Sequence, residues 1–214
     1  GRLNNTSATG AVGVVFPLMA LIQAVGFFFG QGSGNFISRA LGAGENERAE
    51  KMAATGFFSS LVAGALITLI GLIILKPLAY ILGATDTIYP YARDYLAVIL
   101  LGTPFICGSF VLNNQLRFQG NAAFAMVGIT VGALLNCVLD PLLIEVAGLG
   151  VTGAAIATSF SQTVSFVLLL VGSRRSGGVF PRIKNITFTR EYIFGIFNGG
   201  APSLARQGIA SVAA

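Results

Sequence analysis

Five long stretches of the chain contain no Asp, Glu, Lys or Arg: residues 3–38, 53–75, 95–116, 118–139 and 146–173. A helix needs about 20 such residues to cross a hydrocarbon core of roughly 30 Å. Because lipid offers no water to backbone amides, a spanning segment must be a helix or part of a closed barrel. Barrel strands alternate polar and apolar side chains, and the run from Leu66 to Leu75 does not. The pattern therefore predicts an all-α, polytopic membrane protein.

The composition supports this class and disfavours others. Only 10% of the 214 residues are charged, whereas soluble domains carry about 25%, and the mean hydropathy is +0.80. The net charge of +5 comes without a basic stripe interleaved with aromatics, so nucleic-acid binding is not predicted. The chain has no His, and Cys107 and Cys137 lack metal-ligand spacing, which favours small apolar roles for both thiols. We therefore expect neither an enzyme nor a cofactor.

Turn residues and charges divide the chain into five spans and the start of a sixth. The predicted spans are residues 10–38, 52–75, 95–115, 121–145 and 151–172, with the sixth beginning near Pro202. Residues 76–94 form an interfacial connection. A basic loop covers 173–190, and the apolar spacing of Ile193, Phe194, Ile196 and Phe197 predicts an amphipathic linker helix lying in the membrane interface. Because the chain lacks an initiating Met and ends in an apolar run, we expect a fragment of a longer protein.

The distribution of basic residues predicts the orientation in the membrane. Nine cations follow the first, third and fifth spans, and three lie on the opposite side: Arg39, Arg48, Lys51, Arg117, Arg174, Arg175, Arg182, Lys184 and Arg190, against Arg2, Lys76 and Arg93. Positive charge is enriched in cytoplasmic loops. Residues 39–51, 117–121 and 173–190 are therefore predicted to face the cytoplasm of an inner-membrane, multi-pass protein. Tyr80, Tyr89, Tyr91 and Tyr95 would form an aromatic belt on the outer side.

Glycines recur at helical spacing in two spans. Gly26, Gly30 and Gly34 are four residues apart, and Gly128 and Gly132 repeat the interval. Small residues on one face allow helix backbones to approach closely in lipid. The pattern predicts either plain bundle packing or a seam along which helices slide.

One acidic residue lies at the end of an uncharged run. Asp140 follows 22 uncharged residues, Asn136 lies one turn earlier, and Pro141 comes next. An intramembrane Asp is costly and is usually functional. Pro141 cannot donate to the carbonyl of Cys137, so a kink with a free carbonyl is expected. A proton or sodium site is the favoured hypothesis; a solvated Asp near the outer interface and a direct contact with a charged ligand are the alternatives.

Four collinear segments form a recognisable set: Ser38–Gly44 followed by Arg48 and Ala49, then Leu116–Asn121, Asn136–Ile144 and Gly153–Thr158. Together they resemble the multidrug and toxic compound extrusion family, in its bacterial branch of MepA-like and DinF-like pumps. The resemblance implies a twelve-helix, two-lobe transporter, active as a monomer in membrane lipid. Residues 1–172 would form family helices two to six of the N-terminal lobe, 173–198 the inter-lobe loop and linker, and 199–214 the start of helix seven. It also implies that Asp140, Asn136 and Thr158 bind the coupling ion, with a partner acid on helix one.

The implied activity is export of amphipathic or cationic small molecules, driven by inward sodium or proton flow. Several intramembrane amides are candidates for the substrate cavity or for plain interhelical hydrogen bonds: Gln23, Gln31, Asn35, Asn113, Asn114 and Gln162. A flippase for lipid-linked precursors would need cations inside its cavity. The five predicted spans contain no buried Lys or Arg, and Arg206 in the partial sixth span is the one exception. A structural membrane subunit without transport would need no ion site, so the Asn136–Asp140 pair argues against this class. If Asp140 carries the ion, Thr158 should face it across a short outer turn, since the two lie at similar depth.

Overall fold

The computed structural model describes residues 6–212, and within this part it contains helices and no strands. Its helices are α1 (Thr6–Gly42), α2 (Asn46–Ile73), α3 (Leu75–Ile81), α4 (Tyr89–Phe118), α5 (Ala122–Pro141), α6 (Gly150–Arg175) and α7 (Arg190–Val212), with a π-helical turn at Leu142–Val146 and a 3-10 turn at Ile183–Asn185. Five of them, α1, α2, α4, α6 and α5 with its π-helical extension, are long and apolar enough to span a membrane. The prediction of an all-α bundle with five spans is therefore confirmed. Residues 1–5, with Arg2, and 213–214 lie outside the described part.

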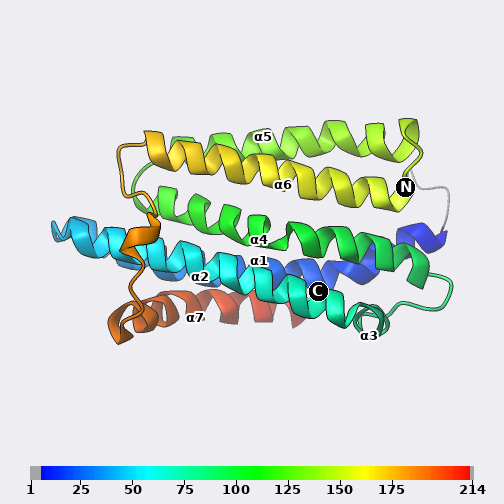
Figure 1. Ribbon diagram of the computed structural model, residues 1–214, viewed down its shortest axis with the longest axis horizontal. Helices are drawn as coiled ribbons and strands as arrows, with labels where there is room; N and C mark the ends of the chain where they lie inside the picture. Colours follow the sequence, from blue (N-terminus) through cyan, green and yellow to red (C-terminus); the bar gives the residue numbers. More distant parts are fainter. Residues whose placement is uncertain (1–5, 213–214) are drawn as a thin grey trace.

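The helices pack as one elongated bundle around α4 (Figure 1). Two thirds of the apolar window of α4 is buried, against about a third or less in every other span. α4 packs against α1, α2 and α6, while α5 packs mainly on α6 and α7 mainly on α1. In Figure 1, α5 and α6 lie together along one side of the bundle and α7 lies along the other. The exposed apolar faces of α2 and α5 are those expected of helices in contact with lipid.

The two glycine patterns mark close helix contacts. Along α1, Gly26, Gly30 and Gly34 each face a side chain of α4, one turn of α4 after another: Phe110, Asn114 and Phe118. On α5, Gly128 and Gly132 face Leu169 and Ser165 of α6. A β-carbon at Gly26 would lie 2.8 Å from that of Phe110, so the helices could not approach this closely with any larger residue. The glycines therefore serve the packing that the sequence indicated.

The helix ends differ from the prediction in two regions. The expected connection at 76–94 contains α3 and the first turns of α4. The expected interfacial helix and separate sixth span are instead one helix, α7, in which Pro202 is internal. Tyr192 and Ile196 of α7 are buried, with the Tyr192 ring against Phe36 of α1. Because α1 supplies this support, the chain stays helical through the expected break, and the predicted boundary at 198/199 falls within α7.

The outer connection is held by aromatic and polar contacts. The rings of Tyr80 and Tyr89 stack with centroids 5.3 Å apart. The Tyr80 hydroxyl donates to Asp86 Oδ1 at 2.9 Å, and this hydrogen bond raises the pKa of Tyr80 above its ordinary value. These contacts stabilise the short α3 segment between α2 and α4.

Candidate functional site

Three polar side chains from two helices meet near the end of α5. Asn136 Nδ2 lies 3.5 Å from Asp140 Oδ1 on the next turn of α5. The same nitrogen lies 3.5 Å from Thr158 Oγ1 on α6. All three side chains are half-buried. The structure thus brings the three predicted ion-site residues together across the α5–α6 contact.

The turn between α5 and α6 sets this register. Gly148 and Gly150 have positive φ angles of 67° and 55°, which a glycine adopts without strain. They reverse the chain within a few residues, so α5 and α6 lie antiparallel and adjacent. The close approach at Gly128 and Gly132 then continues along the whole pair. Thr158 is consequently at the depth of Asn136, as the residue count predicted.

The backbone changes its helical form directly after Asp140. The α-helix ends at Pro141 and continues as the π-helical segment Leu142–Val146. Pro141 has no N–H, so it cannot donate to the carbonyl of Cys137. The structure shows a change from α- to π-helix beside Asp140, while the kink with a free carbonyl stays a prediction. π-helical turns of this kind are frequent at functional sites.

Tyr95 of α4 is a further residue of this site. Its side chain is 5% exposed and lies close enough to Thr158 and Asp140 to interact with both. The sequence placed Tyr95 in the outer aromatic belt because it follows the polar connection. The structure places it inside the bundle, on the helix that packs against α1, α2 and α6. Its position at the start of an uncharged run was the only sequence signal for burial.

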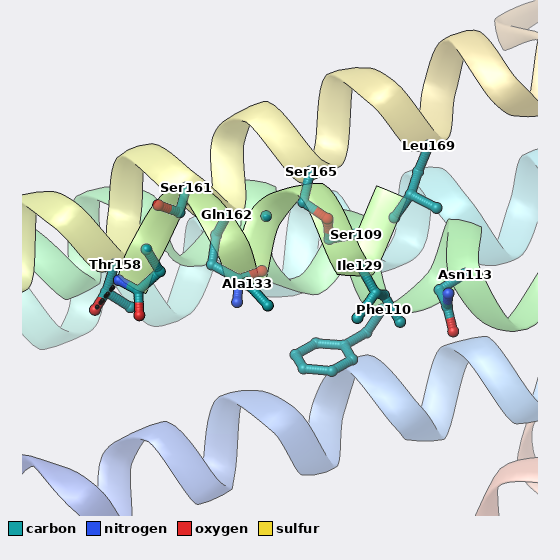
Figure 2. A pocket seen from close by; sticks show the side chains of 12 residues that line it. Ser109, Phe110, Asn113, Ile129, Ala133, Thr158, Ser161, Gln162, Ser165 and Leu169 are labelled. Carbon is teal, nitrogen blue, oxygen red and sulfur yellow. Dashed lines mark hydrogen bonds between the residues drawn. The ribbon is translucent and has the colours of Figure 1, made fainter. Parts of the chain in front are cut away.

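A cavity of about 340 Å³ extends from the site between α4, α5 and α6 (Figure 2). Asn136 and Thr158 line one end, and Asn113, Gln162 and Phe110 line the remainder together with serines and small apolar residues. No Lys or Arg is among these lining residues. The cavity therefore offers hydroxyl and amide groups within an otherwise apolar wall.

Two serines that line this cavity have no hydrogen-bond partner among the described residues. Ser109 and Ser161 are 4% and 2% exposed, and their hydroxyl oxygens are fully buried. Ser165, on the same face of α6, instead donates to the carbonyl of Gly128 at 2.9 Å. Buried hydroxyl groups are normally paired with protein or water. The two serines are therefore candidate polar groups of this site that the sequence analysis did not identify.

The other predicted cavity residues separate into three positions. Asn113 and Gln162 line the cavity, and Gln23 lines a smaller pocket of about 30 Å³ that also reaches Thr158. Gln31 lies at the α1–α7 contact, where its Oε1 accepts a hydrogen bond from Ser203. Asn35 is exposed, and Asn114 faces Gly30. The last three therefore lie outside the described cavity.

The donor set fits a monovalent cation or a proton better than a transition metal. Asp140 supplies a carboxylate, Thr158 a hydroxyl and Asn136 an amide whose oxygen a half-turn would present. Within residues 6–212, no three His, Cys, Asp or Glu side chains cluster as a metal site. Of the two thiols, Cys107 is buried as predicted, whereas Cys137 is exposed on α5. Hard oxygen ligands alone remain at the site.

Comparison with known proteins gives consistent matches. The MatE family model matches residues 1–142. The multidrug export protein MepA of Staphylococcus haemolyticus (strain JCSC1435) is 32% identical over 204 residues, which cover 95% of this chain and 45% of that protein. MepA of Staphylococcus aureus (strain MRSA252) is 28% identical over the same shares. The chain thus spans about half the length of the curated relatives it matches.

Solved structures agree with these relatives. A chain described as the outward-facing conformation of a multidrug resistance MATE family transporter of the MOP superfamily matches with a TM-score of 0.91 and 32% identity, over 98% of this chain and 47% of that one. The inward-facing conformation matches with a TM-score of 0.88 and 32% identity, over 94% and 46%. A MOP superfamily transporter from Pyrococcus furiosus matches with a TM-score of 0.89 and 32% identity, over 98% and 47%.

Proposed function

Because the chain belongs to the MatE family, the multidrug and toxic compound extrusion family, we propose that it forms the N-terminal lobe of a secondary transporter. That transporter exports amphipathic or cationic small molecules and is driven by inward flow of sodium ions or protons. The chain is a multi-pass membrane protein with five apolar helices. Its cytoplasmic side carries residues 39–51, 117–121 and 173–190, and the transporter works as a monomer.

The observation that carries this proposal is the convergence of Asp140, Asn136 and Thr158. An Asp in a membrane span is a functional residue by default, because lipid disfavours its charge. Here it accepts a hydrogen bond from the neutral amide of Asn136, which also reaches Thr158, so no cationic side chain competes for the carboxylate within the described residues. Binding neutralises the site, and release restores the charge. A two-state transporter needs such a differential interaction to couple ion flow to a conformational change.

The neighbouring cavity supports export over the flippase alternative. Ligand sites are mainly apolar, with a few polar groups that orient the ligand. Phe110 and Ile129 supply the apolar surface, while Asn113 and Gln162 supply amide groups for hydrogen bonds. A site for an anionic pyrophosphate would need cations, and its described lining contains none. Neutral or cationic amphipathic compounds fit this lining.

The decisive test is Asp140→Asn in the transporter that contains this chain. The amide keeps the shape of the side chain but can neither bind a proton nor neutralise a cation. We expect gradient-driven efflux from reconstituted vesicles to fall at least a hundredfold, with expression and membrane insertion near normal. Asp86→Asn is the matched control, because Asp86 lies in the exposed outer connection. Efflux of Asp140→Asn at the rate of this control would disprove the assignment of Asp140.

A further inference from the structure

The segment between α6 and α7, residues 176–189, is tied to the bundle by three polar contacts. We call this segment the linker. The Gln119 side chain donates to the carbonyl of Val179 at 3.3 Å and accepts from its N–H at 2.7 Å. Thr55 of α2 pairs in the same two-way manner with the backbone of Thr187, at 3.2 and 3.0 Å. The Asn185 side chain donates to Glu50 at 3.0 Å. The linker is therefore held against the ends of α2 and α4.

These contacts fix the linker at the depth of the membrane interface. Thr55 lies nine residues inside α2, which begins at Asn46, so Thr187 lies about 14 Å along the helix from the α1–α2 turn. The uncharged part of α2 starts directly after Lys51. Figure 1 shows the α1–α2 end of the bundle projecting past the linker. The linker thus lies beside the start of the uncharged part of α2, and the α1–α2 turn extends beyond it.

The exposed side chains of the linker are cationic and apolar. Arg182 and Lys184 are exposed beside Ile183, which is 73% exposed, and Phe188, which is 66% exposed. Residues 173–190 contain five cations and no acid. In the described part of the chain, none of these cations forms an ion pair, whereas the acids nearby are engaged with other partners. The linker therefore presents uncompensated positive charge next to two exposed hydrophobic side chains.

We propose that the linker is a docking surface for the phosphate headgroups of anionic phospholipids in the cytoplasmic leaflet. The proposal rests on the orientation given above and not on the transported compound. Arg182 and Lys184 bind the phosphates, while Ile183 and Phe188 enter the boundary of the acyl chains. Because the three contacts already hold the backbone, binding orders only side chains. The charge and the depth together favour lipid over a soluble polyanion.

The test is a fluorescence titration at two positions of the transporter. With Cys107 and Cys137 replaced by Ala, Ile183→Cys is labelled with an environment-sensitive fluorophore and titrated with phosphatidylglycerol in mixed micelles. We expect a saturable blue shift that phosphatidylcholine and inorganic phosphate do not produce. Asn46→Cys is the control for depth, since it lies at the projecting turn, and it should show no shift. Size-exclusion chromatography verifies that each labelled protein is folded.

A charge variant separates lipid binding from simple burial. Each cation near an anionic membrane contributes about 1 kcal/mol, or slightly more than a fivefold gain in affinity. Removing two cations in R182Q/K184Q should therefore raise the phosphatidylglycerol concentration at half-saturation about 30-fold. The control K76Q/R93Q removes two exposed cations from the outer side and should leave this concentration unchanged. A blue shift before lipid is added, an equal shift with free phosphate, or an unchanged R182Q/K184Q would each overturn the proposal. The readout needs no transport, so it stands apart from the result for Asp140→Asn.

Discussion

Gly199→Ala tests whether the α1–α7 contact depends on direct backbone approach. A β-carbon at Gly199 would lie 2.9 Å from Gly32 Cα and 3.0 Å from its carbonyl oxygen. Ordinary contact begins at about 3.5 Å between carbon atoms, so the helices would have to separate by roughly half an ångström. Both contacts are with backbone, which cannot rotate away as a side chain would. The substitution therefore acts on the separation of the two helices.

The expected effect follows from the energy of overpacking. Forcing a methyl group into a packed contact costs about 1–3 kcal/mol, which corresponds to about a 5- to 150-fold change in an equilibrium constant. If α7 begins the second lobe, this contact holds the two lobes together on the cytoplasmic side. Gly199→Ala should then shift the population toward states in which α7 has left α1. Gly13→Ala is the control, because a β-carbon there meets nothing within 4 Å.

The assay is cross-linking between Gln31→Cys and Ser203→Cys with a short bifunctional thiol reagent, in a background without the native cysteines. The native side chains at these positions are hydrogen-bonded, so the pair reports directly on the contact. We expect cross-linking to slow at least severalfold with Gly199→Ala and to stay unchanged with Gly13→Ala. Equal rates in both variants, at equal thermal stability, would refute the close-approach reasoning.

Two further predictions concern the ion site and the orientation. Tyr95→Phe should raise the cation concentration for half-maximal transport severalfold while sparing the maximal rate, since the lost hydroxyl lies beside Thr158 and Asp140. Tyr80→Phe is the control, and equal cation dependence in both variants would count against this role. Single cysteines at 46 and 86 should react with impermeant thiol reagents from opposite sides of the membrane, and labelling of both from one side would contradict the proposed orientation.

The helices were largely predictable because uncharged runs record contact with lipid. What these runs could not give was the full length of the helices. α1 continues to Gly42 and α2 begins at Asn46, because helices extend beyond the membrane into regions where charged residues are favourable. The continuity of α7 was missed for a different reason. Pro202 is compatible with a first turn or an internal position, and only the packing of Ile196 on α1 decides between them.

The core of the candidate site was predictable in part from spacing, because the polar pair on α5 stood out by itself, whereas Thr158 was implied by the family resemblance and the spacing gave only its depth. Asn136 and Asp140 lie one turn apart, and the short turn after α5 brings Thr158 to the same depth. Tyr95 could not be found this way, since no local sequence pattern indicates which helix packs against α6 beside Thr158. Ser161 was also missed, because a serine in a membrane span usually bonds to its own backbone. Its lack of a partner is visible only once the cavity is known.

The placement of the site on α5 has a mechanical consequence. Within the described chain, only 17% of the apolar window of α5 is buried, against 67% for α4. Asp140 thus belongs to a helix with little buried surface. Thr158 belongs to α6, and Tyr95 belongs to the buried α4. A cation shared between Asp140 and Thr158 would draw α5 toward α6, and its release would leave the carboxylate charge without that partner. The change from α- to π-helix after Pro141 lies where such a movement would be absorbed, since backbone bonding there is already irregular. Ion binding is therefore expected to alter α5 first and the α1–α4 core last.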